Sequence, residues 1–133
     1  MDSALSNLVE GTEDWLTDVL DTDRTCLLFT HVPIDLPETR DYILSVDANR
    51  SMTKYVLSGA PDLYRHHLQG RVSHTFTGHL HFTGLLRHNT TQFHLCNTGI
   101  SMHDPNRDQN SVASAILLEQ NGTGLDIQKV TVQ

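Results

Sequence analysis

The chain has 133 residues, about the length of one domain, and no composition shift or linker rich in Pro, Gly or Ser divides it. Nine Lys and Arg against 16 Asp and Glu give a net charge of −7, which excludes a groove that tracks a nucleic-acid backbone and docking on an anionic membrane. We therefore expect one domain over residues 1–133, with no nucleic-acid or membrane partner.

The cysteines and the apolar runs indicate an intracellular protein. Cys26 and Cys96 lie far apart inside apolar segments, without Cys-x-x-Cys spacing, and are predicted to be buried free thiols. No apolar run approaches the ~18 residues that span a bilayer, and the first residues lack the pattern of a signal peptide. The predicted location is cytoplasmic.

The first thirty residues predict helix followed by strand. Residues 2–10 have apolar side chains at helical spacing, and Thr12 is the expected N-cap of a second helix. We expect the apolar face of that helix to pack in the core; it consists of Trp15, Leu16, Val19 and Leu20. The continuous apolar run 25–30 predicts a strand covered on both faces, which ends at His31-Val32-Pro33.

The middle of the chain is harder to assign. The carboxylate-rich stretch from Asp35 to Arg50 is predicted to be a surface loop with one helical turn around Asp41–Leu44. Short helices are expected at Met52–Leu57 and Asp62–Gln69, the latter ended by Gly70.

The second half predicts mostly antiparallel sheet. A strand at Arg71–Thr77 leads into Gly78-His79-Leu80-His81. Two hairpins follow, one from Gly84–Arg87 and Gln92–Asn97, the other from Ser111–Glu119 and Leu125–Val132. The expected fold class is α/β (α+β), with a mixed sheet and antiparallel C-terminal hairpins.

His79 and His81 are candidate metal ligands. On extended backbone they would point to the same side, because side chains of a strand alternate with period two. His31 also follows a strand, and ligands of α/β domains bind at the carboxyl ends of strands. Spacing alone leaves open that His79 and His81 are solvent-facing loop residues and that His31 bonds a backbone carbonyl.

The other histidines are predicted to be structural or solvated. His66 and His67 are expected on the solvent side of a helix, and His74 within the sheet. Surface positions are expected for His88, His94 and His103, with His103 a further candidate for the mouth of a substrate site.

A helix with Trp15-Leu16, an apolar strand ending in His31-x-Pro33 and a strand ending in Gly78-His79-x-His81 occur in this order. The order resembles the C-terminal half of the calcineurin-like metallophosphoesterases, and residues 12–83 carry the resemblance. It implies the C-terminal half of a four-layer αββα sandwich and a phosphoester substrate. It also implies two divalent ions (Mn, Fe or Zn), one bound by His31 and His79 and the other by His81, with a metal-bound water attacking phosphorus.

The upstream motifs of that family are absent from this chain. They are Asp-x-His, Gly-Asp-x-x-Asp and Gly-Asn-His, which supply the bridging carboxylate, the other ligands and the catalytic histidine, so no catalytic residue is assigned here. Without a bridging carboxylate the repulsion between two cations is uncompensated, and we expect at most one metal and an inactive isolated chain.

Three explanations of the incomplete site remain open. The chain is a fragment whose N-terminal half is missing, a subunit completed by a partner chain, or a decayed paralogue. The first predicts an apolar exposed face. The alternative function is a non-catalytic interaction module or single-metal-binding module on the same fold.

Overall fold

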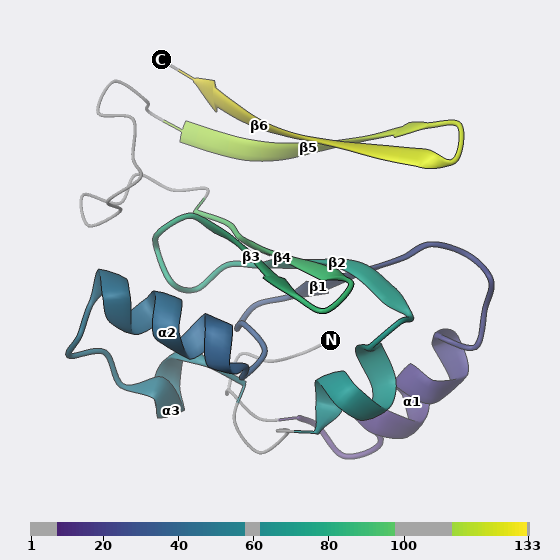
Figure 1. Ribbon diagram of the computed structural model, residues 1–133, viewed down its shortest axis with the longest axis horizontal. Helices are drawn as coiled ribbons and strands as arrows, with labels where there is room; N and C mark the ends of the chain where they lie inside the picture. Colours follow the sequence, from purple (N-terminus) through teal and green to yellow (C-terminus); the bar gives the residue numbers. More distant parts are fainter. Residues whose placement is uncertain (1–7, 58–61, 98–112, 133) are drawn as a thin grey trace.

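The protein is described by a computed structural model that covers residues 8–57, 62–97 and 113–132 (Figure 1). A layer of helices, a four-stranded sheet and a two-stranded sheet are stacked in that order. The elements are α1 (Thr12–Val19), β1 (Cys26–Thr30), α2 (Pro37–Val46), α3 (Met52–Tyr55), η1 (Tyr64–Leu68), β2 (Val72–Thr77), β3 (Gly84–His88), β4 (Thr91–Leu95), β5 (Ala113–Asn121) and β6 (Gly124–Val132). The predicted α/β class with a mixed sheet is confirmed.

The four-stranded sheet has the order β1-β2-β4-β3. β2 runs parallel to both β1 and β4, and Thr77 is in register with Thr30 on one side and Leu95 on the other. Three strands therefore end at the same edge of the sheet. The predicted antiparallel pairing is confirmed for the β3–β4 and β5–β6 hairpins, and the parallel pairs of β2 make the sheet mixed.

One face of this sheet packs on the helices. Leu28, Thr75 and Phe93 lie side by side on adjacent strands and are buried there. The larger core cluster also contains Leu16, Leu20, Ile34, Leu36, Leu57, Leu63, Tyr64, Leu68 and Val72, and a smaller cluster contains Ile43, Val56, Leu80, Phe82 and Leu95. The smaller cluster lies behind the loop that follows β2.

The opposite face of the sheet lies under the β5–β6 hairpin, which covers it only in part. Phe29 and Phe76 stack there with ring centroids 5.0 Å apart. Phe76 is buried, but Phe29, on the edge strand β1, is 55% exposed. The prediction that β1 is covered on both faces is therefore wrong at Phe29.

The first helix confirms its predicted position but not its predicted packing. Gly11, with φ of 80°, occupies the N-cap in place of Thr12. Leu16 and Leu20 are buried, whereas Trp15 is 49% exposed and Val19 is also exposed. α1 packs against η1 at one end of the helical layer, so only half of its apolar face finds a partner.

The stretch predicted to be a loop contains a helix of ten residues, α2. Pro37 starts it, and Thr39 and Ile43, one turn apart, are its buried residues. The Tyr42 hydroxyl donates to the Thr83 carbonyl at 2.5 Å, and a Cβ on Gly84 would collide with the Tyr42 ring. The sequence did not predict this helix because only two of its side chains, four positions apart, are buried, and they stand among several carboxylates.

The remaining short elements follow prediction more closely. α3 occupies part of the predicted helix Met52–Leu57, and in η1 the Gln69 amide donates to the Tyr64 carbonyl at 2.7 Å, which makes that turn wider than an α-helical turn. Both cysteines are free and half-buried. The predicted apolar spacing of residues 2–10 lies mostly outside the described residues.

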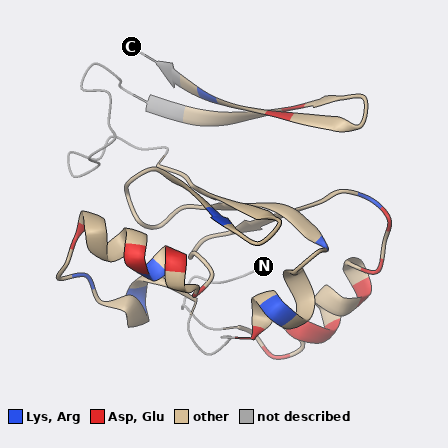
Figure 2. Ribbon diagram, in the orientation of Figure 1, with Lys and Arg blue, Asp and Glu red and all other residues tan. Residues whose placement is uncertain are grey.

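Charge is concentrated in the helical layer (Figure 2). Arg87 is the single Lys, Arg, Asp or Glu of β1 to β4, whereas α1 and α2 carry several carboxylates. None of the helices in the described part of the chain has the length and apolar character needed to cross a membrane.

Two buried threonines of the sheet give a matched test of the core. The Thr75 hydroxyl is fully buried and lacks a hydrogen-bond partner among the described residues, whereas the Thr91 hydroxyl donates to the Val72 carbonyl at 2.8 Å. Thr75→Val should raise the free energy of unfolding by about 1 kcal/mol, and Thr91→Val should lower it by about 1–3 kcal/mol. Urea denaturation measures both, and equal effects would contradict the assignment.

Candidate metal-binding site

His31 is presented by a fixed turn at the end of β1. The Thr30 hydroxyl donates to the Val32 carbonyl at 2.8 Å, and Val32 is fully buried. The Leu57 amide donates to the Pro33 carbonyl at 2.8 Å, which ties the turn to the segment after α3. Both neighbours of the His31 side chain are thereby anchored while His31 itself is exposed.

The loop after β2 lies directly beside this turn. The Gly78 amide donates to the His31 carbonyl at 3.2 Å, so the two strand ends meet. The expected extended backbone is wrong, because His79 and His81 have φ of 65° and 62°. Such left-handed conformations cost ordinary residues about 1–2 kcal/mol each.

Buried side chains maintain the strained loop. Leu80 and Phe82 alternate with the two histidines and belong to the smaller core cluster. Arg50 donates from Nη1 to the Leu80 carbonyl at 3.0 Å, and its guanidinium lies 4.4 Å from the centre of the Tyr55 ring. Packing of Leu80 and Phe82 in the core leaves His81 exposed and His79 half-buried.

His79 contacts two groups that determine which of its nitrogens carries hydrogen. Its Nε2 lies 3.0 Å from the Lys54 carbonyl oxygen, which can only accept, so Nε2 is the donor. In the neutral ring Nδ1 then has a lone pair, and it lies 3.1 Å from His31 Nε2. A ring N–H donated to a backbone carbonyl is the usual second contact of a metal-bound histidine.

The electrostatic environment keeps His79 neutral. Burial lowers the pKa of His79, and the neighbouring His31, His81 and Arg50 lower it further, against the Lys54 hydrogen bond that raises it. Neutral imidazole is the form that binds metal. The ring also lies against His31 and Tyr55, with centroids at 4.9 and 5.3 Å.

The structure brings together two of the three predicted ligands. His31 and His79 are in contact, and His81 is exposed but near enough to His79 to affect its pKa. Within residues 8–57, 62–97 and 113–132, no group of three or more His, Cys, Asp or Glu side chains is arranged to hold a metal ion. The arrangement therefore supplies two imidazoles, and further ligands would have to be added.

Sequence reasoning missed the residues that support this pair. Arg50, Lys54 and Tyr55 contact the loop or His79, and none belongs to a recognisable motif. The backbone carbonyl of Lys54 acts independently of its side chain, so residue type gives no signal there. The one signal in the sequence was the predicted helix Met52–Leu57, because α3 carries Lys54 and Tyr55.

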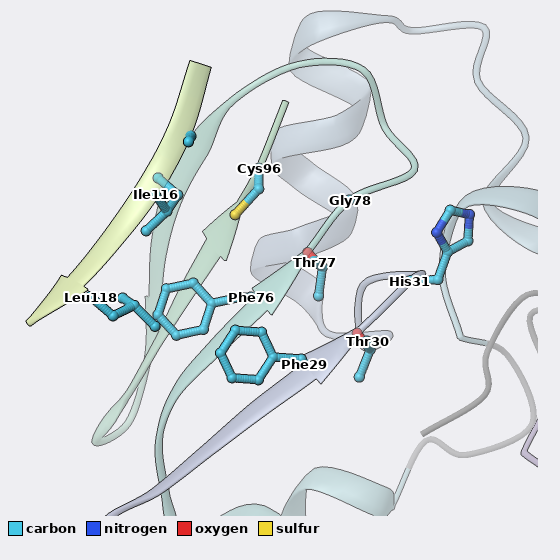
Figure 3. A pocket seen from close by; sticks show the side chains of 10 residues that line it. Phe29, Thr30, His31, Phe76, Thr77, Gly78, Cys96, Ile116 and Leu118 are labelled. Atoms are coloured by element: carbon cyan, nitrogen blue, oxygen red, sulfur yellow. The ribbon is translucent and has the colours of Figure 1, made fainter. Parts of the chain in front are cut away.

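A pocket of about 510 Å³ extends from His31 beneath the hairpin (Figure 3). Its walls are mainly apolar, with Phe29 and Phe76 from the sheet and Ile116 and Leu118 from β5. Cys96 also lines it, but burial raises the pKa of the Cys96 thiol, which disfavours the nucleophilic thiolate. The pocket offers space for an apolar group next to His31.

The other histidines only partly follow prediction. His66 is exposed as expected; His67 is half-buried, with Nδ1 3.2 Å from the Thr17 hydroxyl. His88 Nδ1 donates a hydrogen bond to Glu38 Oε1 at 2.9 Å, and this hydrogen bond lowers the pKa of Glu38. His103 lies outside the described residues.

A second pair of histidines lies within the sheet. His74, predicted to be a satisfied sheet residue, places Nδ1 3.2 Å from His94 Nε2. The surface position predicted for His94 is wrong, since it is 9% exposed. Burial lowers the pKa of both rings, and His74 lowers that of His94 further.

Comparison with known proteins adds no assignment. The chain matches no protein-family model and no curated protein.

Relief of backbone strain at His81 should be measurable. Because His81 is exposed with φ of 62°, His81→Gly should raise the free energy of unfolding by about 1 kcal/mol. His66→Gly, at an exposed position of η1, should lower it instead. Urea denaturation compares the two, and a loss of stability in His81→Gly would contradict a strained loop.

The His74–His94 pair predicts acid sensitivity. Its rings have pKa values below the ordinary 6.5, so the unfolded chain binds more protons once the pH falls through that value. Stability should be complete above pH ~7 and decline as the pH falls through 6.5 toward the folded pKa values. His74→Gln should reduce the decline between pH 7.5 and 5.5 (about one unit either side of 6.5) in denaturation curves, whereas the exposed-site control His66→Gln should preserve it.

Proposed function

We propose that this protein is a metal-dependent phosphoester hydrolase of the calcineurin-like type, in which His31, His79 and His81 bind the metal ions. One observation carries the proposal: the Lys54 carbonyl holds the Nε2 hydrogen of His79, which leaves its Nδ1 lone pair beside His31 Nε2. The left-handed backbone of His79 and His81 adds support, because strain of this kind clusters at functional sites.

The layers of the fold support the finer assignment. A calcineurin-like domain is a four-layer αββα sandwich, and this chain has helices, a mixed sheet and a further two-stranded sheet in that order. Phe29, on the sheet face under the hairpin, and Trp15, in the helical layer, are both exposed, and each would be available to further structure. We propose that the chain corresponds to the C-terminal half of that sandwich.

The chemistry would require two divalent ions. Bound together they clamp phosphate oxygens, favour hydroxide from bound water and offset the charge that develops at phosphorus. His31 and His79 would hold one ion and His81 the other, while neutral imidazoles leave the charge of the metal intact. Among the described residues no Asp or Glu joins His31 and His79 in a ligand group, so we propose that the bridging carboxylate comes from beyond the described residues or from a partner chain.

A single-metal interaction module is the second candidate. It is favoured by the finding that His31 and His79 meet without a third ligand from the described residues, which suits one ion completed by water better than a dinuclear pair. In that case the apolar pocket beside His31 would bind a partner rather than a leaving group.

Metal binding and turnover separate the two candidates. We expect the full chain to bind Mn²⁺ in calorimetry, and His79→Asn to weaken this binding about 10–100-fold, with exposed His66→Asn as the matched control. Hydrolysis of an aryl phosphate that needs Mn²⁺ and disappears in His79→Asn would establish the hydrolase. Binding without turnover would favour the module, and no binding at His79 would refute both.

A further inference from the structure

The His74–His94 pair, of which His94 is buried, lies apart from the candidate site. His74 belongs to β2 and His94 to β4, two adjacent parallel strands, and both side chains are on the face under the hairpin. The Phe76 ring stacks on His94 at 4.6 Å with an angle of 14° between the planes. His94 is therefore held by packing, while half-buried His74 remains accessible.

The separation of the two rings fits shared coordination of a metal ion. Metal–imidazole bonds of ~2.0–2.1 Å in a tetrahedral site separate two ligand nitrogens by about 3.3 Å. His74 Nδ1 and His94 Nε2 are 3.2 Å apart. Binding of an ion would therefore leave the separation of the two nitrogens almost unchanged, with the rings turned so that both lone pairs point at the ion.

The protonation state of the pair also fits. Burial lowers the pKa of each ring, so both are neutral at pH 7. In a neutral pair one facing nitrogen donates and the other accepts. Binding of an ion requires the donor ring to move its hydrogen to its outer nitrogen, so two lone pairs face the ion and no net proton is released.

A pocket of about 480 Å³ between the sheet and the hairpin reaches His94. Gln92, the register partner of His74, lines it and carries a side-chain oxygen. The charged groups that face this region are Lys129, on β6, and Arg87, on β3. Lys129 is exposed and therefore screened, and Arg87 donates to the Asn89 carbonyl at 3.2 Å, toward the β3–β4 turn.

We propose that His74 and His94 form a second site for a divalent transition-metal ion of the zinc type, with two imidazole ligands and water in the remaining positions. The site is independent of the proposed hydrolase function. Because the ion would link residues of different strands in the folded state only, the stability of the fold would rise with the logarithm of the ion concentration once this exceeds the dissociation constant.

Zinc binding to a chain without the first site tests the proposal. The full chain with His79→Asn should still bind one equivalent of Zn²⁺ in calorimetry and show a higher thermal midpoint with Zn²⁺ present. Adding His74→Asn should weaken the remaining binding at least tenfold and abolish the thermal shift, whereas adding His66→Asn should change neither. Zinc binding that survives His74→Asn, or no binding in the His79→Asn chain, would overturn the proposal.

A measurement that keeps both ligands intact guards against misfolding of the variants. Side-chain ¹⁵N spectra of the His79→Asn chain should show the ring nitrogens of His74 and His94 shifting together as Zn²⁺ is added. Histidines elsewhere, such as His66, should remain unchanged. Shifts confined to other histidines would overturn the assignment whether or not zinc binds.

Discussion

The parallel pairing of β1 with β2 is the constraint on which the candidate site depends. Its register places Thr30 beside Thr77, so the residues after both strands leave the sheet at the same edge. The hydrogen bond from the Gly78 amide to the His31 carbonyl continues this pairing by one step. Two histidines 48 positions apart in the chain meet because the strands before them end together.

In the loop beyond that edge, two residues have strained backbone conformations while their neighbours are buried. Leu80 and Phe82 are almost fully buried, and Arg50 secures the carbonyl between the two strained histidines. Burial of two large apolar side chains contributes about 1.5–3 kcal/mol each, which is enough to offset the cost of about 1–2 kcal/mol for each left-handed residue. The fold can thus maintain His79 and His81 in conformations that stability alone would assign to glycine.

The strands could be predicted from the sequence, because they follow from its apolar runs, whereas the meeting of His31 with His79 was implied only by the family resemblance. The sequence did not predict α2, whose buried Thr39 and Ile43 stand among carboxylates, or the exposure of Trp15, which depends on what packs against α1. The contact between His74 and His94 could not be predicted from the sequence either, because it requires β4 to pair with β2. The pairing of distant strands depends on the whole sheet, whereas the spacing of apolar residues in the sequence predicts only local structure.

The place of β1 at the end of the sheet has a geometric consequence. In the order β1-β2-β4-β3, β1 pairs with only one of the described strands. An incoming strand parallel to β1 would finish at the same edge, and its last residue would come to lie next to His31. Recruitment of such a strand would therefore extend the sheet and deliver a new side chain to the histidine pair in one step.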